Sequence, residues 1–149
     1  MSLAKLEFDE YVIEHLVDEH GLERFNALRG ALKFGVEGAI PEGRTWIIYS
    51  RRDSRDCGYL RVVPFRDGEQ ELGFALIPEA RGKGIMSAVL PRFVSMLNEN
   101  FYTETSDQNI AAIRVIEKAG FKSCMPVHPE HVTPHGETVR TAAFRLAAP

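Results

Sequence analysis

The hydrophobic positions at the start of the chain follow first the period of a strand and then that of helices. Apolar and charged residues alternate over 4–8, which predicts a short, half-buried strand. Asp9 is a suitable N-cap, and the apolar stripe over 12–17 predicts a helix that ends by Gly21. A second stripe over 22–32 predicts another helix immediately afterwards.

The middle of the chain has the pattern of paired strands. Gly35 closes the second helix, and a loop is expected over 38–43. Polar residues over 51–55 and the pair Asp67-Gly68 are turn signals between apolar runs. Three strands are therefore predicted, over 46–50, 57–65 and 71–77.

Strands and helices interleave in the remainder of the chain. Pro78 ends the preceding strand, and a long helix follows Gly84, with an expected kink at Pro91. The further predicted elements are a strand over 101–105, a helix over 110–119, and strands over 121–126 and 138–146. This order predicts an α/β or α+β layered domain with a mixed sheet.

Composition narrows the class of protein. The 149 residues are expected to form one domain, 1–149, with 44% hydrophobic and 26% charged residues. The formal charge of -3 argues against a nucleic-acid partner, and no apolar run has the length of a membrane span. The N-terminus lacks a signal-peptide pattern, so a cytoplasmic protein is expected. Cys57 and Cys124 are expected to be reduced thiols, because their spacing indicates neither a zinc site nor a disulfide framework.

A glycine-rich loop precedes the long helix. Gly82 and Gly84 let a ligand approach the backbone closely, and the unpaired N–H groups at the start of the helix suit a phosphate. Arg81 and Lys83 add positive charge. The loop is not a P-loop, because Lys83 is followed by glycine, and it departs from the dinucleotide fingerprint at Ser87. A helix N-terminus without a ligand is the alternative interpretation.

Two segments together resemble the signatures of the GNAT superfamily of N-acetyltransferases. The run over 81–86, Arg-Gly-Lys-Gly-Ile-Met, resembles its acetyl-CoA loop, with Arg81 and Gly84 at the matching positions. Met86 stands where the family usually has a small residue, as in the branch that acts on ribosomal-protein N-termini and polyamines. The run over 109–121, an Asn-headed helix ending in Glu-Lys-Ala-Gly-Phe, is similar to the second signature.

The resemblance implies a fold, a cosubstrate and an acceptor. The implied fold is a mixed, mostly antiparallel central sheet of six or seven strands with helices on both faces. The implied cosubstrate is acetyl-CoA, whose arm would pair with the backbone of Ala75, Leu76 and Ile77 and be held by Asn109. A plain N-cap is the alternative role for Asn109. A small-molecule or peptide amine is the implied second substrate, and a homodimer is an assembly that the resemblance allows. The residues implied around the pyrophosphate are Arg81, Gly82, Lys83, Gly84, Ile85 and Met86.

Glu71 is the candidate general base. The resemblance places a glutamate at the start of this strand, and the two-residue period puts the small residues Gly73 and Ala75 on the same face, which leaves room for a substrate. An exposed carboxylate at a strand end is the alternative interpretation.

The general acid is where the chain departs from the family. The resemblance implies a tyrosine where this sequence has Ile116, which has no proton to give to a leaving thiolate. Tyr102 and Ser106 are the candidate substitutes, and Glu104 is a second candidate base. A structural role is the alternative for each of them.

Three histidines, His128, His131 and His135, lie before the last predicted strand. Their spacing resembles a metal cluster, but Pro129 and Pro134 interrupt any helix and no cysteine lies in the loop. No metal site is therefore expected, and a solvated or substrate-facing loop is favoured. In the second case a histidine is suited to take a proton from the amine.

The sequence thus predicts a single-domain N-acetyltransferase that moves the acetyl group from acetyl-CoA to a primary amine by direct attack in a ternary complex. The isoleucine at position 116 leaves a non-catalytic acyl-CoA-binding or sensing module as the alternative. A structural domain that has lost the cofactor is a further alternative. The sequence does not identify the amine.

Overall fold

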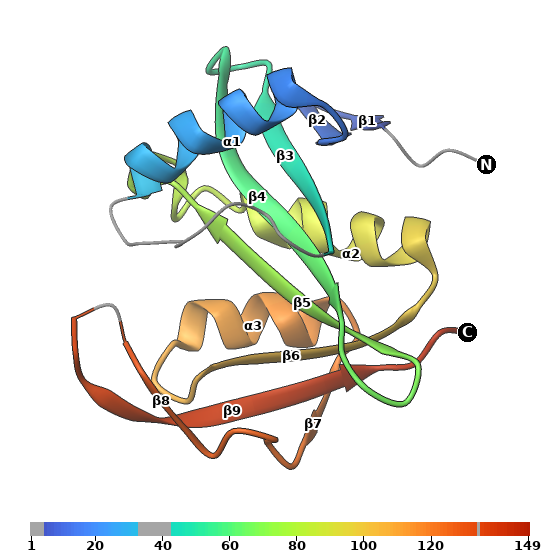
Figure 1. The fold of residues 1–149 in the computed structure, drawn as a ribbon, viewed down its shortest axis with the longest axis vertical. Helices are drawn as coiled ribbons and strands as arrows, with labels where there is room; N and C mark the ends of the chain where they lie inside the picture. The colour runs from blue at the N-terminus through green and yellow to red at the C-terminus, as the bar shows by residue number, and fades with distance from the viewer. Residues whose placement is uncertain (1–4, 33–42, 134) are drawn as a thin grey trace. The chain divides into compact units, whose positions relative to one another are not determined.

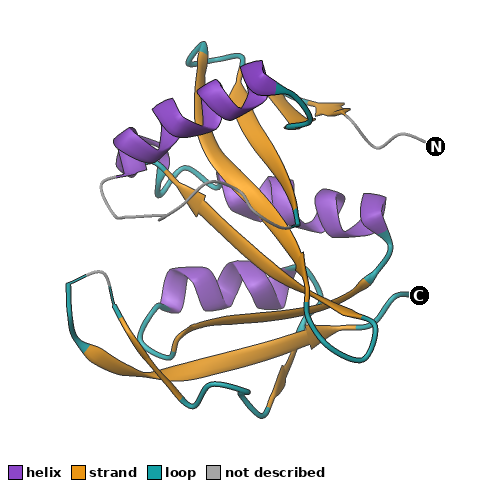
Figure 2. Cartoon of the chain, in the orientation of Figure 1, coloured by secondary structure: helices purple, strands orange, loops and turns teal. Residues whose placement is uncertain are grey.

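The structure is a computed structural model that describes residues 5–32, 43–133 and 135–149. These residues form two units, each combining strands with helices (Figure 2). The first unit contains the described residues up to Val63 together with Gly73–Ile85, and the second contains those in Pro64–Leu72 and Met86–Pro149. Strand β5 (Glu69–Leu76) begins in the second unit and ends in the first.

The first unit is built on antiparallel strands and a helix that lies over them (Figure 1). Its elements are β1 (Lys5–Phe8), β2 (Tyr11–His15), α1 (Glu19–Leu32), β3 (Arg44–Ser50), β4 (Arg55–Pro64) and the 3-10 helix η1 (Pro78–Ala80). β1 pairs with β2, β2 with β3, and β3 with β4. The rings of Phe25 on α1 and Tyr59 on β4 meet edge to face, with 5.6 Å between their centroids, so α1 packs against this sheet.

The helix predicted over 12–17 is wrong, because these residues form β2 and the segment after it. Asp9 does not cap a helix; its φ of 50° places it in the turn between β1 and β2. Tyr11 and Ile13 are buried and their neighbours are half-buried, which is the period of a strand. Pairing with β1 on one side and β3 on the other satisfies the backbone of β2, so sheet formation outweighs a stripe that also fits a helix.

The helix predicted over 22–32 is confirmed as α1, which starts earlier than expected. The carboxylate of Asp18 accepts a hydrogen bond from the N–H of Gly21 at 2.8 Å, so Asp18 provides the cap that was assigned to Asp9. The buried side of α1 is formed by Phe25, Leu28 and Leu32. Gly35 and the predicted loop over 38–43, apart from Gly43, lie outside the described residues.

A guanidinium group joins three elements of the first unit. Arg24 on α1 donates to both carboxylate oxygens of Asp56 on β4, at 2.9 and 3.2 Å. It also pairs with Glu14 on β2. Only 22% of the Arg24 side chain is exposed, so these charge-assisted bonds are partly shielded from water.

We expect Arg24→Met to lower the free energy of unfolding by about 1–2 kcal/mol, because two carboxylates would then face each other without the cation. Urea unfolding of this variant and of Arg29→Met, a substitution on the same helix outside the cluster, measures the difference. Equal losses in the two variants would contradict the role given to Arg24.

The strands predicted over 46–50, 57–65 and 71–77 are confirmed as β3, β4 and β5. The polar tip between β3 and β4 is an exposed turn over 51–54. Asp67 and Gly68 form the turn before β5, with φ values of 50° and 77°. These turn signals were therefore sufficient to place the strand ends to within about two residues.

The second unit is built around two long strands, β6 (Asn100–Ser106) and β9 (Thr138–Leu146). β6 pairs in parallel with β5 and antiparallel with β9. The other elements are α2 (Ile85–Leu97), α3 (Ile110–Lys118), β7 (Lys122–Cys124) and β8 (Glu130–Val132). β7 and β8 both pair with β9. The predicted helices after Gly84 and over 110–119, and the strands over 101–105, 121–126 and 138–146, are confirmed.

The predicted fold class is confirmed as an α/β fold with mixed, mostly antiparallel strand pairing. The described residues hold nine strands rather than six or seven, because β2 replaces a predicted helix and β8 lies in a predicted loop. Within the same residues, no helix combines the length and apolar character needed to cross a membrane. A single domain over 1–149 and the kink at Pro91 stay predictions.

Candidate active site

The glycine-rich loop of the first unit has an open backbone. Gly82 and Gly84 have φ values of 73° and 76°, in the left-handed region that favours glycine. No atom lies within 4 Å of the position that a β-carbon would take at either residue. Arg81 and Lys83 are exposed beside them. This shape and charge fit the phosphates of a nucleotide cofactor at the start of a helix.

The helix that follows the loop supplies further N–H groups. α2 begins at Ile85, and the side chains of Ile85 and Met86 are 3% and 5% exposed. Because the first N–H groups of a helix have no partner within it, these two residues are suited to bind an anion through their backbone rather than their side chains.

The end of β5 is fixed by bonds within the first unit. The N–H of Ile77 donates to the carbonyl of Cys57 at 2.9 Å, and the Ile77 carbonyl accepts from the N–H of Ala80 at 3.0 Å. The carbonyl of Leu76 accepts from Nε of Arg81 at 3.2 Å. Ile77 therefore anchors the strand end. Ala75 and Leu76, which are half-buried, are the residues of the predicted trio better placed to meet a cofactor arm.

The neighbouring strand is shaped to accept this strand end. The register of β3 and β4 pairs Ile48 with Gly58 and Tyr49 with Asp56, so Cys57 is an extra residue, as in a β-bulge. A β-carbon at Gly58 would lie 2.5 Å from the Ala75 carbonyl oxygen and 2.7 Å from Cδ2 of Leu76. Only glycine permits this approach of the two strands.

We expect Gly58→Ala to weaken acetyl-CoA binding about tenfold and to lower the free energy of unfolding by about 1–3 kcal/mol, because Ala75 and Leu76 must move. Calorimetric titration and urea unfolding measure the two effects. Gly30→Ala on α1 is the control, since no atom lies within 4 Å of its β-carbon position. Unchanged binding in Gly58→Ala would separate this strand end from the cofactor site.

Carboxylates and an imidazole gather in the second unit. Glu71 is paired in register with Tyr102 on β6, and Glu104 follows Tyr102 on the same face of that strand. Burial raises the pKa of Glu71 above its usual value, the charge of Glu104 adds to the rise, and His128 partly offsets it. These three ionisable groups therefore act on one another.

The ring of Tyr102 contacts an aromatic ring and a guanidinium group. It is fully buried and stacks on Phe65, with 4.7 Å between ring centroids. The guanidinium carbon of Arg145 lies 5.2 Å from the ring centroid, and Arg145 is itself bonded to Glu69 at 2.7 Å. Burial, together with the hydrogen bond to Glu104, raises the pKa of Tyr102, so its hydroxyl stays protonated and able to donate.

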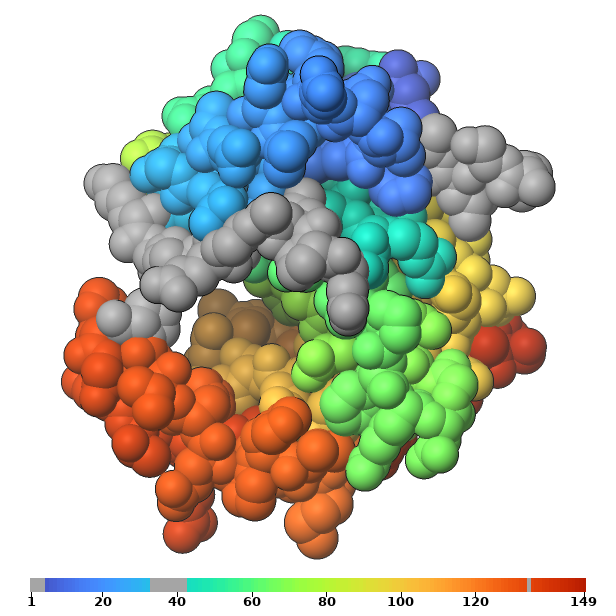
Figure 3. All heavy atoms as spheres, viewed as in Figure 1, coloured from blue at the N-terminus to red at the C-terminus, as the bar shows by residue number. Residues whose placement is uncertain are grey.

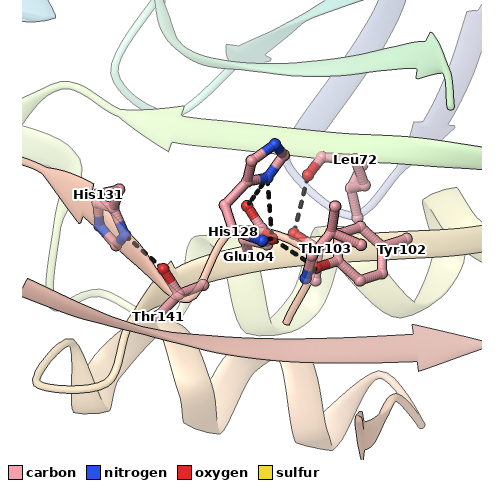
Figure 4. A network of polar contacts seen from close by, with 8 residues as sticks. Leu72, Tyr102, Thr103, Glu104, His128, His131 and Thr141 are labelled. Atoms are coloured by element: carbon pink, nitrogen blue, oxygen red, sulfur yellow. Dashed lines mark hydrogen bonds and ion pairs between the residues drawn. The ribbon is translucent and has the colours of Figure 1, made fainter. Parts of the chain in front are cut away.

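Glu104 is the centre of the polar network shown in Figure 4. Its carboxylate accepts hydrogen bonds from the Tyr102 hydroxyl at 2.5 Å and from the N–H of His128 at 3.1 Å. Nδ1 of His128 lies 3.0 Å from its Oε1. The Tyr102 hydroxyl also accepts from the N–H of Val127 at 2.7 Å. Burial alone would raise the pKa of Glu104, but these bonds outweigh it and lower the pKa, which keeps the carboxylate ionised.

The remaining predicted site residues occupy defined positions. The side-chain oxygen of Asn109 accepts from the N–H of Ala112 at 3.2 Å, so Asn109 is the N-cap of α3. Its contact with the cofactor stays a prediction. Ser106 accepts from the N–H of Gln108 at 3.2 Å, and Ile116 is buried.

The loop before β9 separates the three histidines. His128 pairs with Glu104, whereas Nδ1 of His131 lies 2.9 Å from the Thr141 hydroxyl. His135 is exposed. In Figure 3 the segment around 125–133 lies on the surface of the molecule. The sequence singled out Tyr102, Glu104 and these histidines, but the coupling of His128 to Glu104 was missed, since the two residues lie far apart in the chain.

Comparison with known proteins identifies the family. A family model described as an acetyltransferase (GNAT) domain matches residues 7–122. No curated protein matches the chain. Solved structures share its fold. Ribosomal-protein-S5-alanine acetyltransferase from Vibrio fischeri has 11% identity and a TM-score of 0.74, over 97% of this chain and 96% of that one. Spermidine N-acetyltransferase from Vibrio cholerae, in complex with CoA and spermine, has 14% identity and a TM-score of 0.71, over 93% and 96%.

Because the family model covers most of the chain, the protein belongs to the GNAT acetyltransferase family. It is therefore an acetyl-CoA-dependent N-acetyltransferase. The TM-scores show that the solved structures share this fold, and their low identities to this chain do not define its acceptor. The resemblance inferred from the loop over 81–86 and the helix that begins after Asn109 is thus confirmed.

Proposed function

We propose that the protein acetylates a primary amine by direct attack of the amine nitrogen in a ternary complex with acetyl-CoA. The observation that carries the proposal is the cluster of Glu71, Glu104 and His128 in the second unit. Two carboxylates favour a cationic acceptor by Coulomb attraction, and Glu71 is suited to act on its protons. A small-molecule amine and a peptide N-terminus are both compatible with this cluster.

The loop of the first unit is the proposed cofactor site. Arg81, Gly82, Lys83, Gly84, Ile85 and Met86 would hold the pyrophosphate of acetyl-CoA, Ala75 and Leu76 would pair with its arm, and Asn109 would contact it. When bound, acetyl-CoA supplies the acetyl group as a thioester. The open backbone at Gly82 and Gly84 supports this assignment.

The state of the cysteines supports direct attack rather than a covalent acetyl-enzyme. Cys57 is buried, and burial raises the pKa of its thiol to about 11. Burial also raises the pKa of Cys124. A thiol accepts an acyl group as the thiolate, and neither cysteine is poised to ionise near neutral pH.

Glu71 is the proposed base for the first proton of the ammonium group. Its raised pKa brings it nearer to neutral pH, where general bases are most effective. For the leaving sulfur, Ser106 and Tyr102 stay the candidate acids. Tyr102 is the less available of the two, because its hydroxyl proton is engaged by Glu104.

A thiol-release assay tests the proposal. Acetyl-CoA is incubated with the protein and with a panel of alkylamines, polyamines and peptides with free N-termini. We expect thiol release with at least one amine. Double-reciprocal plots of initial rate against amine concentration, at several fixed acetyl-CoA concentrations, should give intersecting lines. Mass spectrometry should find no acetylated protein. Parallel lines with an acetylated cysteine would contradict direct attack. Tight acetyl-CoA binding without release for any amine would contradict the proposed transfer.

A further inference from the structure

The proposed reaction has to remove two protons from each acceptor nitrogen. An alkylammonium nitrogen carries three protons, and the nitrogen of the product amide carries one. As the nitrogen–carbon bond forms and the carbon–sulfur bond breaks, the electron pair stays with sulfur. Sulfur ends as a thiol with one proton, and the other proton goes to the medium. In this sequence of steps Glu71 still carries the first proton while the amide forms, and that proton finally replaces the one that the candidate acid gives to sulfur. The second proton, which is the one released to the medium, then goes to a different acceptor.

The second unit provides such a group within electrostatic reach of Glu71. The side chain of His128 is 60% exposed, and its Nδ1 lies 3.0 and 3.2 Å from the two oxygens of Glu104. An ionised carboxylate only accepts hydrogen bonds, so Nδ1 carries the hydrogen and Nε2 of the neutral ring has a lone pair. Figure 4 shows Nε2 directed away from Glu104.

The position of Glu104 is itself determined by its donors. Its two oxygens accept hydrogen bonds from the Tyr102 hydroxyl, from the backbone N–H of His128 and from Nδ1 of the same residue. A carboxylate has enough lone pairs for all three donors, whereas a glutamine has one oxygen and adds an N–H₂ donor. The ring of Tyr102 is itself fixed by stacking on Phe65 and by the contact with Arg145, so its hydroxyl meets Glu104 in a defined position.

We propose that His128 is the second proton acceptor of this active site: its Nε2 takes the proton that the amine nitrogen loses as the amide forms. The inference rests on the proposed function. His128 is the catalytic residue, and Glu104 and Tyr102 are positioning residues that hold its tautomer and orientation. Because the imidazole is exposed, it passes the proton on to water.

The charged surroundings of His128 are defined by two strands. Glu104 on β6 contacts it directly, and Glu71 on β5 interacts with it through space. Two further titratable groups interact with Glu104: Tyr102, which stays protonated, and Cys124. Because these groups interact, the pH profile of kcat/KM for His128→Ala is compared with the profiles for Glu71→Gln and Glu104→Gln.

The kinetic test compares two substrates. We expect His128→Ala to lower kcat/KM roughly 10²-fold, the lower end for a general base, both for a peptide α-amine and for a lysine-like amine. Both nitrogens lose this second proton. Imidazole added to the solution should restore turnover in proportion to its neutral form. His131→Ala is the matched control, because His131 lies three residues further on, on β8, and its ring pairs with Thr141 instead. Turnover of His128→Ala near that of the control, or no rescue by imidazole, would overturn the inference.

A second measurement does not depend on activity. Nitrogen-15 NMR of the imidazoles in the free protein should show hydrogen on Nδ1 of His128. Glu104→Gln should move it to Nε2 and lower kcat. Hydrogen on Nε2 in the wild-type protein overturns the inference. A wild-type protein that acetylates no amine contradicts the proposed function and the base role together. Full turnover by His128→Ala contradicts the base role alone.

Discussion

Glu71→Gln should lower kcat/KM for a lysine-like amine about 10³-fold, and for a peptide α-amine by less than about tenfold. A lysine-like amine has a pKa near 10.4, so its neutral form at pH 7 costs about 4.6 kcal/mol. An α-amine has a pKa of about 7.7–8.0 and needs about 1 kcal/mol. A base that removes the first proton is therefore worth much more with the first substrate.

The pH dependence of turnover also follows from the ionisation of Glu71. Since burial and the charge of Glu104 raise the pKa of Glu71, its ionised form is lost at a higher pH than for an ordinary glutamate. Turnover of the lysine-like amine by the wild-type protein should fall as the pH decreases through this raised pKa.

Initial rates of thiol release with the two amines measure the effect of Glu71→Gln on kcat/KM. Glu130→Gln is the control, because Glu130 is an exposed carboxylate of the same unit. Equal losses on both amines in Glu71→Gln would remove Glu71 from the role of first base. Such a result would leave the family assignment intact, because it rests on the match over 7–122.

Substitution of the loop glycines should strongly weaken cofactor binding. We expect Gly84→Val to weaken acetyl-CoA binding about 10²- to 10⁴-fold, which corresponds to the loss of about two hydrogen bonds to a charged group. A β-branched residue at a φ of 76° is strained, so the backbone must leave the conformation that presents its N–H groups. Gly82→Val, at a φ of 73°, should act in the same direction.

Gly68→Val is the matched control for these variants. Gly68 has a φ of 77°, and no atom lies within 4 Å of its β-carbon position, as at Gly84. Its turn precedes β5 and carries no proposed binding role. Calorimetric titration should show near wild-type affinity for Gly68→Val. An equal loss of affinity in both variants would mean that the effect comes from destabilisation.

Most strands and helices followed from local patterns. The strands β3, β4 and β5 are bounded by turn residues such as Asp67 and Gly68, and α1 and α3 have apolar stripes at helical spacing. The helix predicted over 12–17 was wrong because its stripe also fits a strand with Tyr11 and Ile13 buried. Only the pairing with β1 and β3 decides between them, and that pairing depends on residues far away in the sequence.

In the candidate site, too, the features set by neighbouring residues were predictable and those set by distant contacts were not. The glycine-rich loop was predictable because its function lies in consecutive residues whose backbone conformation favours glycine. Tyr102 and Glu104 were predictable as neighbours on one strand face. The pairing of Glu104 with His128 was not, because it depends on how the segment before β8 returns to β6. The close approach of Gly58 to Ala75 was hidden for the same reason.

The central claim is that the backbone amides of residues 82–86 bind the pyrophosphate of acetyl-CoA. Amide NMR of the wild-type protein tests it most directly, with CoA and with pantetheine, which lacks the phosphates, added in parallel. We expect CoA to shift the amide resonances of Gly82, Lys83, Gly84, Ile85 and Met86, and pantetheine to leave them in place. Saturating CoA that shifts other amides and leaves these five unchanged would contradict the account.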